Sequence, residues 1–357
     1  MSQPPFRHDQ PDRTGVLLVN LGTPEAPDRA SVRRYLKEFL WDPRVVEVPR
    51  PIWWFVLNMV ILNTRPGRSA KAYQKVWTEQ GSPLLTISRA QETALRQGLQ
   101  ERHGDDMCVS LAMRYGSPSI RQGLEQLRDA GARRLLVLPL YPQYSATTTA
   151  SIFDEVTEVL RGWRWLPEIR FINHYHDEPA YIEALAASVR DWRQQHGEAD
   201  LLLMSFHGIP QEYFDKGDPY HCECHKTGRL LAEALELDPS RWMLSFQSRL
   251  GPKQWLQPYT DKTLHKLATE GTRSVQVICP GFSTDCLETL EEIAMENRDE
   301  FLEAGGERYE YIPCLNDQAS HITMLCDLVD RHSCGWTANR EDPQAVLERA
   351  RKLGATS

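Results

Sequence analysis

Two stretches of this sequence match each other: Leu17-Leu18-Val19-Asn20-Leu21-Gly22-Thr23-Pro24 and Leu203-Met204-Ser205-Phe206-His207-Gly208-Ile209-Pro210. Each carries a mostly apolar run followed by a glycine, with a proline two residues after that glycine. Unbroken apolar runs of this length are typical of strands buried on both faces, as in a parallel sheet. The two stretches therefore predict buried strands that leave their sheets through similar turns.

The features that follow these stretches also match. Arg114-Tyr115-Gly116-Ser117-Pro118 in one half and Arg249-Leu250-Gly251-Pro252 in the other are each followed by a helical pattern, a glycine and another apolar run. A repeated order of features indicates a repeated architecture. We therefore expect two similar halves, over residues 14–173 and 174–335, and a C-terminal tail over residues 336–357.

Short runs rich in Val, Ile and Leu alternate with amphipathic helical stretches along the chain. The expected strands are Val16–Leu21, Val109–Met113, Leu135–Leu140, Ile169–Asn173, Leu201–Phe206, Met243–Gln247, Val275–Cys279 and Tyr309–Ile312. The expected helices are Ala30–Leu40, Arg89–Gln100, Ile120–Ala130, Ile152–Leu160, Ala180–His196, Lys226–Leu237, Thr260–Thr269, Asp285–Ala304 and Ala319–His332. This alternation predicts an α/β fold with parallel sheets covered by helices on both faces.

The composition excludes several classes of protein. The 357 residues carry a formal charge of -8, which argues against a nucleic-acid binder with a basic face. Met1–Thr14 is polar, and no window reaches the ~18–20 apolar residues of a membrane-spanning helix. The eight cysteines form no C-x-x-C pair, so the sequence argues against a zinc ribbon and predicts a cytoplasmic chain with reduced thiols.

A dinucleotide-binding role is also disfavoured. No G-x-G-x-x-G motif follows an expected strand, and the phosphate-binding motif G-x-x-x-x-G-K-[ST] does not occur. Gly22-Thr23-Pro24 lacks the second glycine that lets a pyrophosphate approach the backbone.

Candidate chemistry lies at the carboxyl ends of two expected strands, where open parallel sheets bind ligands. His207 ends one strand, and its imidazole could act as a base or metal ligand, or could be a core histidine bonded to a loop carbonyl. After another strand, spacings of 3, 4 and 4 put Asp285, Glu288, Glu292 and Glu296 on one helix face. That row could conduct cations, or Asp285 and Glu288 could form a capping box beside a solvated face.

Three further segments have two readings each. His221-Cys222-Glu223-Cys224-His225 is either part of a soft metal site or a loop before the following helix. Tyr141–Ser145 is either a polar, aromatic mouth or a turn at a helix start. Ile52–Leu62, flanked by arginines, is either core or an apolar lip that contacts a flat ligand or a membrane surface.

Five blocks of sequence, in order, closely resemble the bacterial ferrochelatases, and the resemblance runs from Gly15 to Arg331. The most specific blocks are Ser205–Pro210, Gly217–Tyr220, Gln247–Pro252 with Trp255, Cys279–Phe282, and Asp285–Leu290. The resemblance implies two Rossmann-like domains with a porphyrin cleft between them. It also implies a lyase that inserts Fe²⁺ into protoporphyrin IX to give protoheme, with Fe²⁺ as a substrate and no resident cofactor.

The resemblance also implies roles for individual residues. His207 and Glu288 are the expected catalytic and iron-binding pair, with Glu292, Glu296 and Asp285 as a path for the metal. The expected porphyrin-binding residues are Tyr73, Ser82, Arg114, Tyr115, Trp255, Leu21 and Phe282. At Leu21 some relatives carry methionine, and at Cys286 some carry histidine, so a second imidazole is not expected in this site.

Some relatives hold a [2Fe–2S] cluster through one mid-chain cysteine and three near the C-terminus. Here the mid-chain position is Ala146, and Cys326 and Cys334 have no close third cysteine. Because thiolate ligation normally needs four donors, we expect no cluster.

Other functions remain open on the sequence. They are a coproporphyrin ferrochelatase, a related cobaltochelatase, or a heme or porphyrin carrier without catalysis, which would need no acidic row. We expect a cytoplasmic protein with peripheral contact to the inner face of the membrane through Ile52–Leu62.

Overall fold

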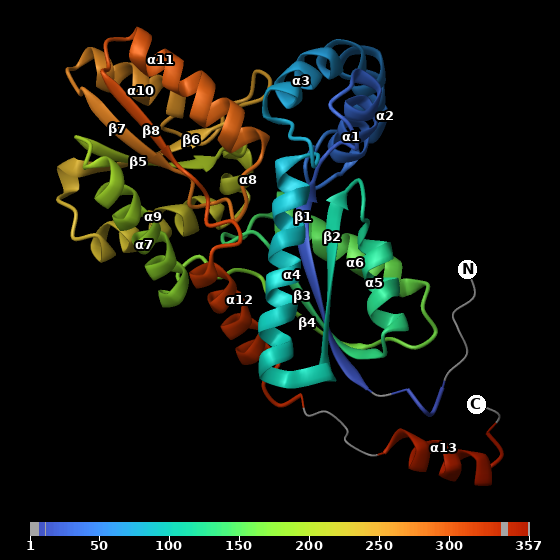
Figure 1. Ribbon diagram of the computed structural model, residues 1–357. Helices are drawn as coiled ribbons and strands as arrows, with labels where there is room; N and C mark the ends of the chain where they lie inside the picture. Colours follow the sequence, from blue (N-terminus) through green and yellow to red (C-terminus); the bar gives the residue numbers. More distant parts are fainter. Residues whose placement is uncertain (1–6, 11, 337–341, 356–357) are drawn as a thin grey trace.

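The computed structural model describes residues 7–10, 12–336 and 342–355, and its framework is two four-stranded parallel sheets (Figure 1). The first sheet has the order β2-β1-β3-β4 and the second β6-β5-β7-β8, so both use the same order. The strands are β1 (Arg13–Gly22), β2 (Met107–Tyr115), β3 (Ala132–Pro139), β4 (Glu168–Phe171), β5 (Leu201–His207), β6 (Trp242–Gln247), β7 (Ser274–Ile278) and β8 (Arg308–Ile312). The predicted α/β class and all eight predicted strands are confirmed, and the shared order agrees with the repeat in the sequence.

Burial explains why these segments are strands. In β1, Val16 to Val19 are fully buried, and in β5 all residues before His207 are buried. Helices cover both faces of each sheet, so both sides of every central strand need apolar side chains. The parallel register also sets His207 opposite Gln247 at the end of β5 and β6.

Most helices fall near their predicted ranges. Those packed around the sheets are α4 (Pro83–His103), α5 (Ile120–Asp129), α6 (Ser151–Arg161), α7 (Pro179–His196), α9 (Tyr220–Ala234), α10 (Thr260–Thr269), α11 (Asn297–Glu303) and α12 (Ala319–His332). Shorter segments are α8 (Gln211–Asp215), the 3₁₀ turns Gly104–Asp106 and Pro239–Arg241, and the π-helices η3 (Ala146–Ala150) and η5 (Glu288–Glu296).

Three helix starts differ from the prediction. Helix α4 begins at Pro83 rather than Arg89, because proline fits the first helical position. Helix α9 begins at Tyr220, so the segment before Lys226 is helix and not loop. The predicted helix over Asp285–Ala304 is instead a π-helix, η5, that continues into α11.

A cluster of helices stands apart from the first sheet beyond the end of β1 (Figure 1). It consists of α1 (Arg29–Trp41), α2 (Arg50–Phe55), the π-helix η1 (Val56–Ile61) and α3 (Leu62–Val76), and we call it the helical flap. Trp53, Leu57 and Leu62 pack with Leu40 into its own small core. The rest of the predicted apolar lip is largely exposed, so Ile52–Leu62 is partly core and partly surface.

Pro66 lies inside α3, where proline removes a backbone hydrogen bond. The carbonyl of Leu62, four residues earlier, is the acceptor that this proline leaves without its usual partner. The guanidinium of Arg33 on α1 donates to that carbonyl instead. A side chain of one flap helix thus compensates for the proline of another.

The two halves share one hydrophobic core. The largest cluster of buried side chains includes Val16 and Leu95 from the first half and Leu202 and Leu325 from the second. Helix α12, from the second half, lies along α4 of the first (Figure 1). The boundary predicted at residue 173 stays a prediction, because the core crosses it.

The predicted tail contains helix α13 (Pro343–Lys352), while 337–341 and 356–357 lie outside the described residues. Within the described ranges, no helix combines the length and hydrophobicity needed to cross a membrane.

Candidate active site

His207 is the last residue of β5 and is partly exposed. Its Nδ1 lies 2.6 Å from the carbonyl oxygen of Gly208, and a carbonyl only accepts, so Nδ1 carries the proton. Nε2 is then the nitrogen with the free lone pair. The rings of Trp255 and Phe282 lie near it, with centroids 6.5 and 6.4 Å from the centroid of the imidazole. The sequence offered a histidine bonded to a loop carbonyl or a histidine that acts as a base or ligand. His207 combines the two, because Nδ1 bonds the Gly208 carbonyl and leaves the lone pair of Nε2 for chemistry.

Gln247 joins His207 to Glu288. It sits opposite His207 in the register, and its carbonyl accepts the Gly208 N–H at 2.7 Å. Its side-chain amide donates to the main-chain carbonyl of Glu288 at 3.1 Å, and its Oε1 accepts from the Ser205 hydroxyl. Gly208 allows this approach, since a Cβ there would lie 2.9 Å from the Gln247 carbonyl. The sequence analysis did not single out Gln247, although it ends a predicted strand.

Glu288 begins η5, whose i→i+5 hydrogen bonds make a wider turn than an α-helix. Glu292 follows, partly buried, and accepts from the N–H of Ser248 at 2.8 Å and from the Ser248 hydroxyl. Burial raises the pKa of Glu292 to about 7, and the charges of Glu288 and Glu296 add to the rise. Glu292 therefore changes its protonation near neutral pH.

Glu296 lies at the exposed end of η5. Burial and then the charge of Glu291 raise the pKa of Glu296 above its ordinary value, while Lys75 opposes the rise. Lys75 of α3 pairs with Glu291 at 2.5 Å, which ties the helical flap to η5. Glu288, Glu292 and Glu296 thus follow one another along a helix from its half-buried start to its exposed end.

Asp285 is separate from this row. Its carboxylate accepts from the Thr289 hydroxyl at 2.9 Å, the Tyr311 hydroxyl at 2.5 Å and the Asn316 amide at 2.7 Å. These three donors occupy the carboxylate, which accepts no backbone N–H of the helix. The capping box considered from the sequence is therefore not formed.

Tyr73, Ser82 and Leu21 belong to the first half, and Tyr73 packs with Leu287, the residue before η5. Burial, and next the charge of Glu288, raise the pKa of Tyr73 well above its ordinary value, so this phenol lies near that carboxylate. Ser82 is buried and accepts from the Thr23 hydroxyl at 2.8 Å. Leu21 is half-buried at the end of β1.

The side chains of Arg114 and Tyr115 are largely buried beneath the protein surface. The Arg114 guanidinium donates to Asp42 at 2.7 Å and to the Ser151 hydroxyl at 2.7 Å. Tyr115 is only 1% exposed, and its hydroxyl also donates to Asp42. In this conformation both side chains are engaged inside the protein.

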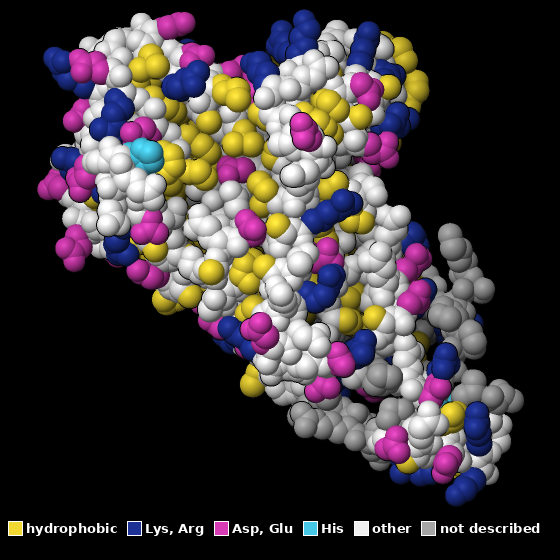
Figure 2. Space-filling view, viewed as in Figure 1, with side chains coloured by type: hydrophobic (Ala, Val, Ile, Leu, Met, Phe, Trp, Pro, Cys, Tyr) yellow, Lys and Arg dark blue, Asp and Glu magenta, His cyan; other side chains and the backbone are white. Residues whose placement is uncertain are grey.

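Trp255 faces the helical flap from the second half. Its indole N–H donates to the Leu250 carbonyl at 3.0 Å, and the Leu250 side chain packs against the flap core. Figure 2 shows the surface hollowed between the flap and the second sheet, with hydrophobic side chains on both walls. The predicted aromatic residues of the second half, Trp255 and Phe282, thus both lie close to His207.

The His221–His225 segment does not form the site that its composition suggested. On helix α9, the imidazoles of His221 and His225 lie side by side with centroids 4.4 Å apart and tilted planes, Cys222 is exposed and Cys224 is buried. Glu223 turns away from all four, toward the junction of the two halves.

Solved structures with a similar fold are metal chelatases at low sequence identity. SirB from Bacillus subtilis with Fe³⁺ aligns with a TM-score of 0.52 at 12% identity, covering 91% of this chain and 97% of that one. The sirohydrochlorin chelatase SirB of Bacillus subtilis subspecies spizizenii, in complex with cobalt, gives 0.51 at 11% identity with the same coverage. These similarities concern the fold.

Similar sequences cover nearly the full chain. Ferrochelatase of Thioalkalivibrio sulfidiphilus is 55% identical over 356 residues, covering 98% of this chain and 96% of that protein. Ferrochelatase of Marinobacter nauticus is 54% identical over 345 residues, with 97% and 93% covered. Ferrochelatase of Chromobacterium violaceum is 51% identical over 358 residues, with 100% and 98% covered.

Two parallel sheets in the same strand order, with candidate metal ligands at the strand ends, define a protein of the chelatase fold. The sequence profile of the ferrochelatase family matches residues 13–333. The chain belongs to the ferrochelatase family, as its sequence motifs predicted.

Proposed function

We propose that His207 and Glu288 are the residues through which this bacterial ferrochelatase inserts ferrous iron into protoporphyrin in heme biosynthesis. The observation that carries the assignment is the Gln247 bridge, which joins the end of β5 to the first residue of η5. This bridge supports an arrangement in which the His207 base and the Glu288 carboxylate are held on the same side of a bound porphyrin.

The reaction needs two groups of this kind. Metal insertion releases two pyrrole N–H protons, and Nε2 of a neutral His207 can accept a proton or hold the incoming ion. Glu288 can take a proton or balance the charge of the metal. A flat macrocycle hides its nitrogen lone pairs, so binding energy from the surrounding side chains would be used to bend it.

The ring itself needs packing faces and polar anchors. Trp255 and Phe282, beside His207, are suited to pack on the macrocycle, and Leu21, half-buried at the end of β1, is a further proposed contact. Tyr73 adds a hydroxyl group near Glu288, and Ser82 adds a second hydroxyl, bonded to Thr23. Arg114 would bind a propionate only by sharing its guanidinium with Asp42, and Tyr115 would act by orienting Arg114.

We propose that iron reaches Glu288 along η5. The order from exposed Glu296 to half-buried Glu292 supports a route inward, and carboxylates suit ferrous iron in transit. Asp285 has no part in this route, because three donors already occupy its carboxylate.

The test is anaerobic insertion of Fe²⁺ into protoporphyrin IX, followed by the change in porphyrin absorption. Rapid turnover with protoporphyrin and slow turnover with coproporphyrin would support the assignment. The reverse preference would indicate a coproporphyrin ferrochelatase, and a preference for Co²⁺ a cobaltochelatase. Tight porphyrin binding without turnover would indicate a carrier.

We also propose that the flap docks on the inner face of a membrane. Trp54 and Phe55 are 51% and 59% exposed, and Ile52, Met59 and Val60 are exposed beside them. An apolar patch with basic neighbours is suited to the interface of an anionic bilayer. The flanking basic residues are Arg44, Arg50, Arg65 and Arg68.

A further inference from the structure

Three metal-ligating side chains meet at the junction of the two halves. His174 and His176 lie between β4 and α7, and Glu223 lies in the first turn of α9. Their donor atoms are all within 4.8 Å of one another, and in the described part of the chain no other such group of three occurs. We propose that this trio binds a divalent first-row transition-metal ion, such as Zn²⁺ or Co²⁺, at a second site distinct from the His207–Glu288 pair.

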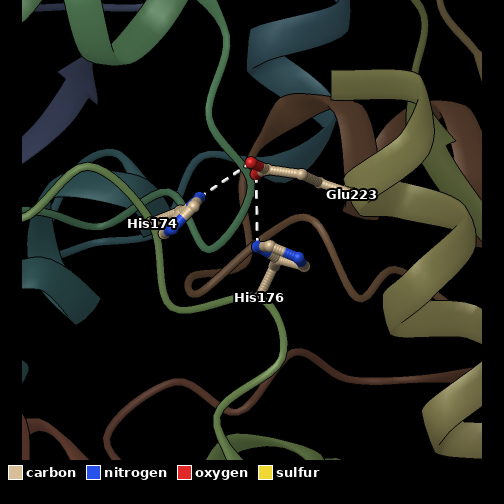
Figure 3. Close-up of side chains that lie close together, drawn as sticks. All are labelled: His174, His176 and Glu223. Atoms are coloured by element: carbon tan, nitrogen blue, oxygen red, sulfur yellow. Dashed lines mark hydrogen bonds and ion pairs between the residues drawn. The ribbon is translucent and has the colours of Figure 1, made fainter. Parts of the chain in front are cut away.

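The geometry is close to that of a bound ion. Nδ1 of His174 is 2.7 Å from one Glu223 oxygen, and Nδ1 of His176 is 3.2 Å from the other. Figure 3 shows both imidazoles directed at the one carboxylate. With metal–ligand bonds of about 2.0–2.2 Å, tetrahedral donors lie roughly 3.3 Å apart. The trio therefore needs only a small opening to admit an ion.

One of these atoms lacks a satisfactory partner. His176 is 4% exposed, yet its Nδ1 makes no hydrogen bond of proper geometry, although Glu223 is near. Buried polar nitrogens are normally paired, because an unpaired one costs free energy. A metal ion between His176 and Glu223 would give this nitrogen a partner. If the trio served only to join the segments by hydrogen bonds, the nitrogen would stay unpaired.

The site has an open side and a firm base. The His174 side chain is 49% exposed, which gives an ion access and leaves room for a water ligand. Glu223 is held by the Tyr144 N–H at 2.6 Å, and the His176 carbonyl accepts from the Thr227 hydroxyl at 2.9 Å. Such outer contacts orient ligands before an ion arrives.

The donor set selects the class of ion. Two imidazole nitrogens and one carboxylate oxygen suit Zn²⁺, Co²⁺ or Fe²⁺ rather than Mg²⁺ or Ca²⁺, which prefer oxygen ligands throughout. An ion here would connect α9 to the segment between β4 and α7, where the chain passes from the first half to the second. Its binding should therefore brace the junction and raise the melting temperature.

The test uses the full-length protein with three background substitutions, His207→Ala, Glu288→Gln and Cys222→Ser. These remove the proposed iron site and an exposed thiol. Calorimetric titration with Zn²⁺ should still find one tight equivalent, and Co²⁺ should give d–d absorption without a thiolate band. Adding His176→Asn should weaken binding by more than the roughly 10- to 100-fold typical of a lost outer contact.

Two further variants keep the test decisive. His174→Ala changes a half-exposed side chain, so it should fold normally and still weaken Zn²⁺ binding. The matched control is His225→Asn on α9, the helix that carries Glu223. The ring of His225 lies against His221, outside the trio, so its loss should leave Zn²⁺ binding unchanged. The proposal is overturned if the background protein binds no equivalent, or if His225→Asn weakens binding as much as His174→Ala.

Discussion

Substitutions of His207 and Glu288 can remove their chemistry while leaving the surrounding structure intact. The Gln247 amide bonds the main-chain carbonyl of Glu288, so Glu288→Gln keeps that bond, and His207→Ala removes a partly exposed ring at a strand end. Each change should lower turnover of Fe²⁺ and protoporphyrin by at least the ~10²-fold typical of lost acid–base groups. Porphyrin affinity, measured by fluorescence quenching, should change little.

The double variant tests whether the two residues act as a unit. Its loss of turnover should be far smaller than the product of the two single losses. Glu300→Gln, an exposed carboxylate on α11, is the matched control and should keep full activity. Near-normal turnover of Glu288→Gln would remove this residue from the chemistry and pass its role to Glu292.

Glu292 should make folding depend on pH. Its pKa is about 7 in the folded protein and near 4.5 in the unfolded chain, so the folded state holds the extra proton between these values. Stability should therefore fall as pH rises from about 4.5 to 7, by on the order of 2–3 kcal/mol. Urea unfolding of the protein and of Glu292→Gln, compared at pH 5 and pH 8, measures this difference.

The amide of Glu292→Gln can still accept from the Ser248 N–H, so the comparison isolates the charge. The stability of the Gln variant relative to the parent should increase between pH 5 and pH 8. An unchanged difference would mean that the buried carboxylate keeps an ordinary pKa.

At the mid-chain position that the resemblance assigns to a cluster ligand, this chain has Ala146, whose N–H donates to Asp218 at 2.7 Å. Cys326 is buried on α12, and Cys334 lies exposed beyond that helix. We expect protein purified anaerobically to contain no acid-labile sulfide. Iron and sulfide in equal, stoichiometric amounts would contradict this prediction.

In the α2–η1 segment, some side chains of the apolar run Ile52–Leu62 are buried in the flap core and others are exposed. The exposed ones can be tested for membrane binding. Replacing Trp54 and Phe55 by serine should sharply reduce binding to anionic liposomes, measured by co-sedimentation. Thermal stability should change little, because both side chains are more than half exposed.

Trp53→Ser is the matched control within the same helix. Trp53 is buried, and its indole N–H donates to the Leu40 carbonyl at 2.6 Å, so its loss should cost about 3–5 kcal/mol. Liposome binding at a temperature where this variant stays folded should persist. Unchanged binding of the Trp54 and Phe55 variants would exclude the docking surface.

The hydrophobic pattern of each helix or strand explains whether its structure could be predicted from the sequence. The strands were predictable because apolar runs such as Val16–Leu21 report burial directly. The π-helix η5 was not, since spacings of three and four fit an α-helical face equally well. Residues Ile52–Leu62 are apolar on every side, so no periodicity separated Trp53 from Trp54.

Sites formed by distant segments were harder to predict. His207 and Glu288 could be proposed from the sequence because each follows a predicted strand. The trio was not, because Glu223 was considered with its neighbours in the chain, whereas its partners His174 and His176 lie far earlier in the sequence, before α7. Gln247 was overlooked because its role depends on the register between β5 and β6.

The shared core predicts how the protein unfolds. Two sheets of separate segments would ordinarily unfold as two domains. Here one buried cluster includes residues of both halves, and α12 lies so close to α4 that a Cβ on Gly98 would be 2.8 Å from Cys326 Sγ. We therefore expect a single urea transition, with the same midpoint by far-ultraviolet circular dichroism and by tryptophan fluorescence.

Leu325 on α12 provides the perturbation for this prediction. It is fully buried in the shared core, so Leu325→Ala should cost about 2–5 kcal/mol and displace the signals of both sheets together. Leu353→Ala, at an exposed position after α13, is the matched control and should leave the midpoint unchanged. If Leu325→Ala instead split the curve into two transitions and moved only one, the halves would be independent domains, and the junction would be a contact surface rather than a core.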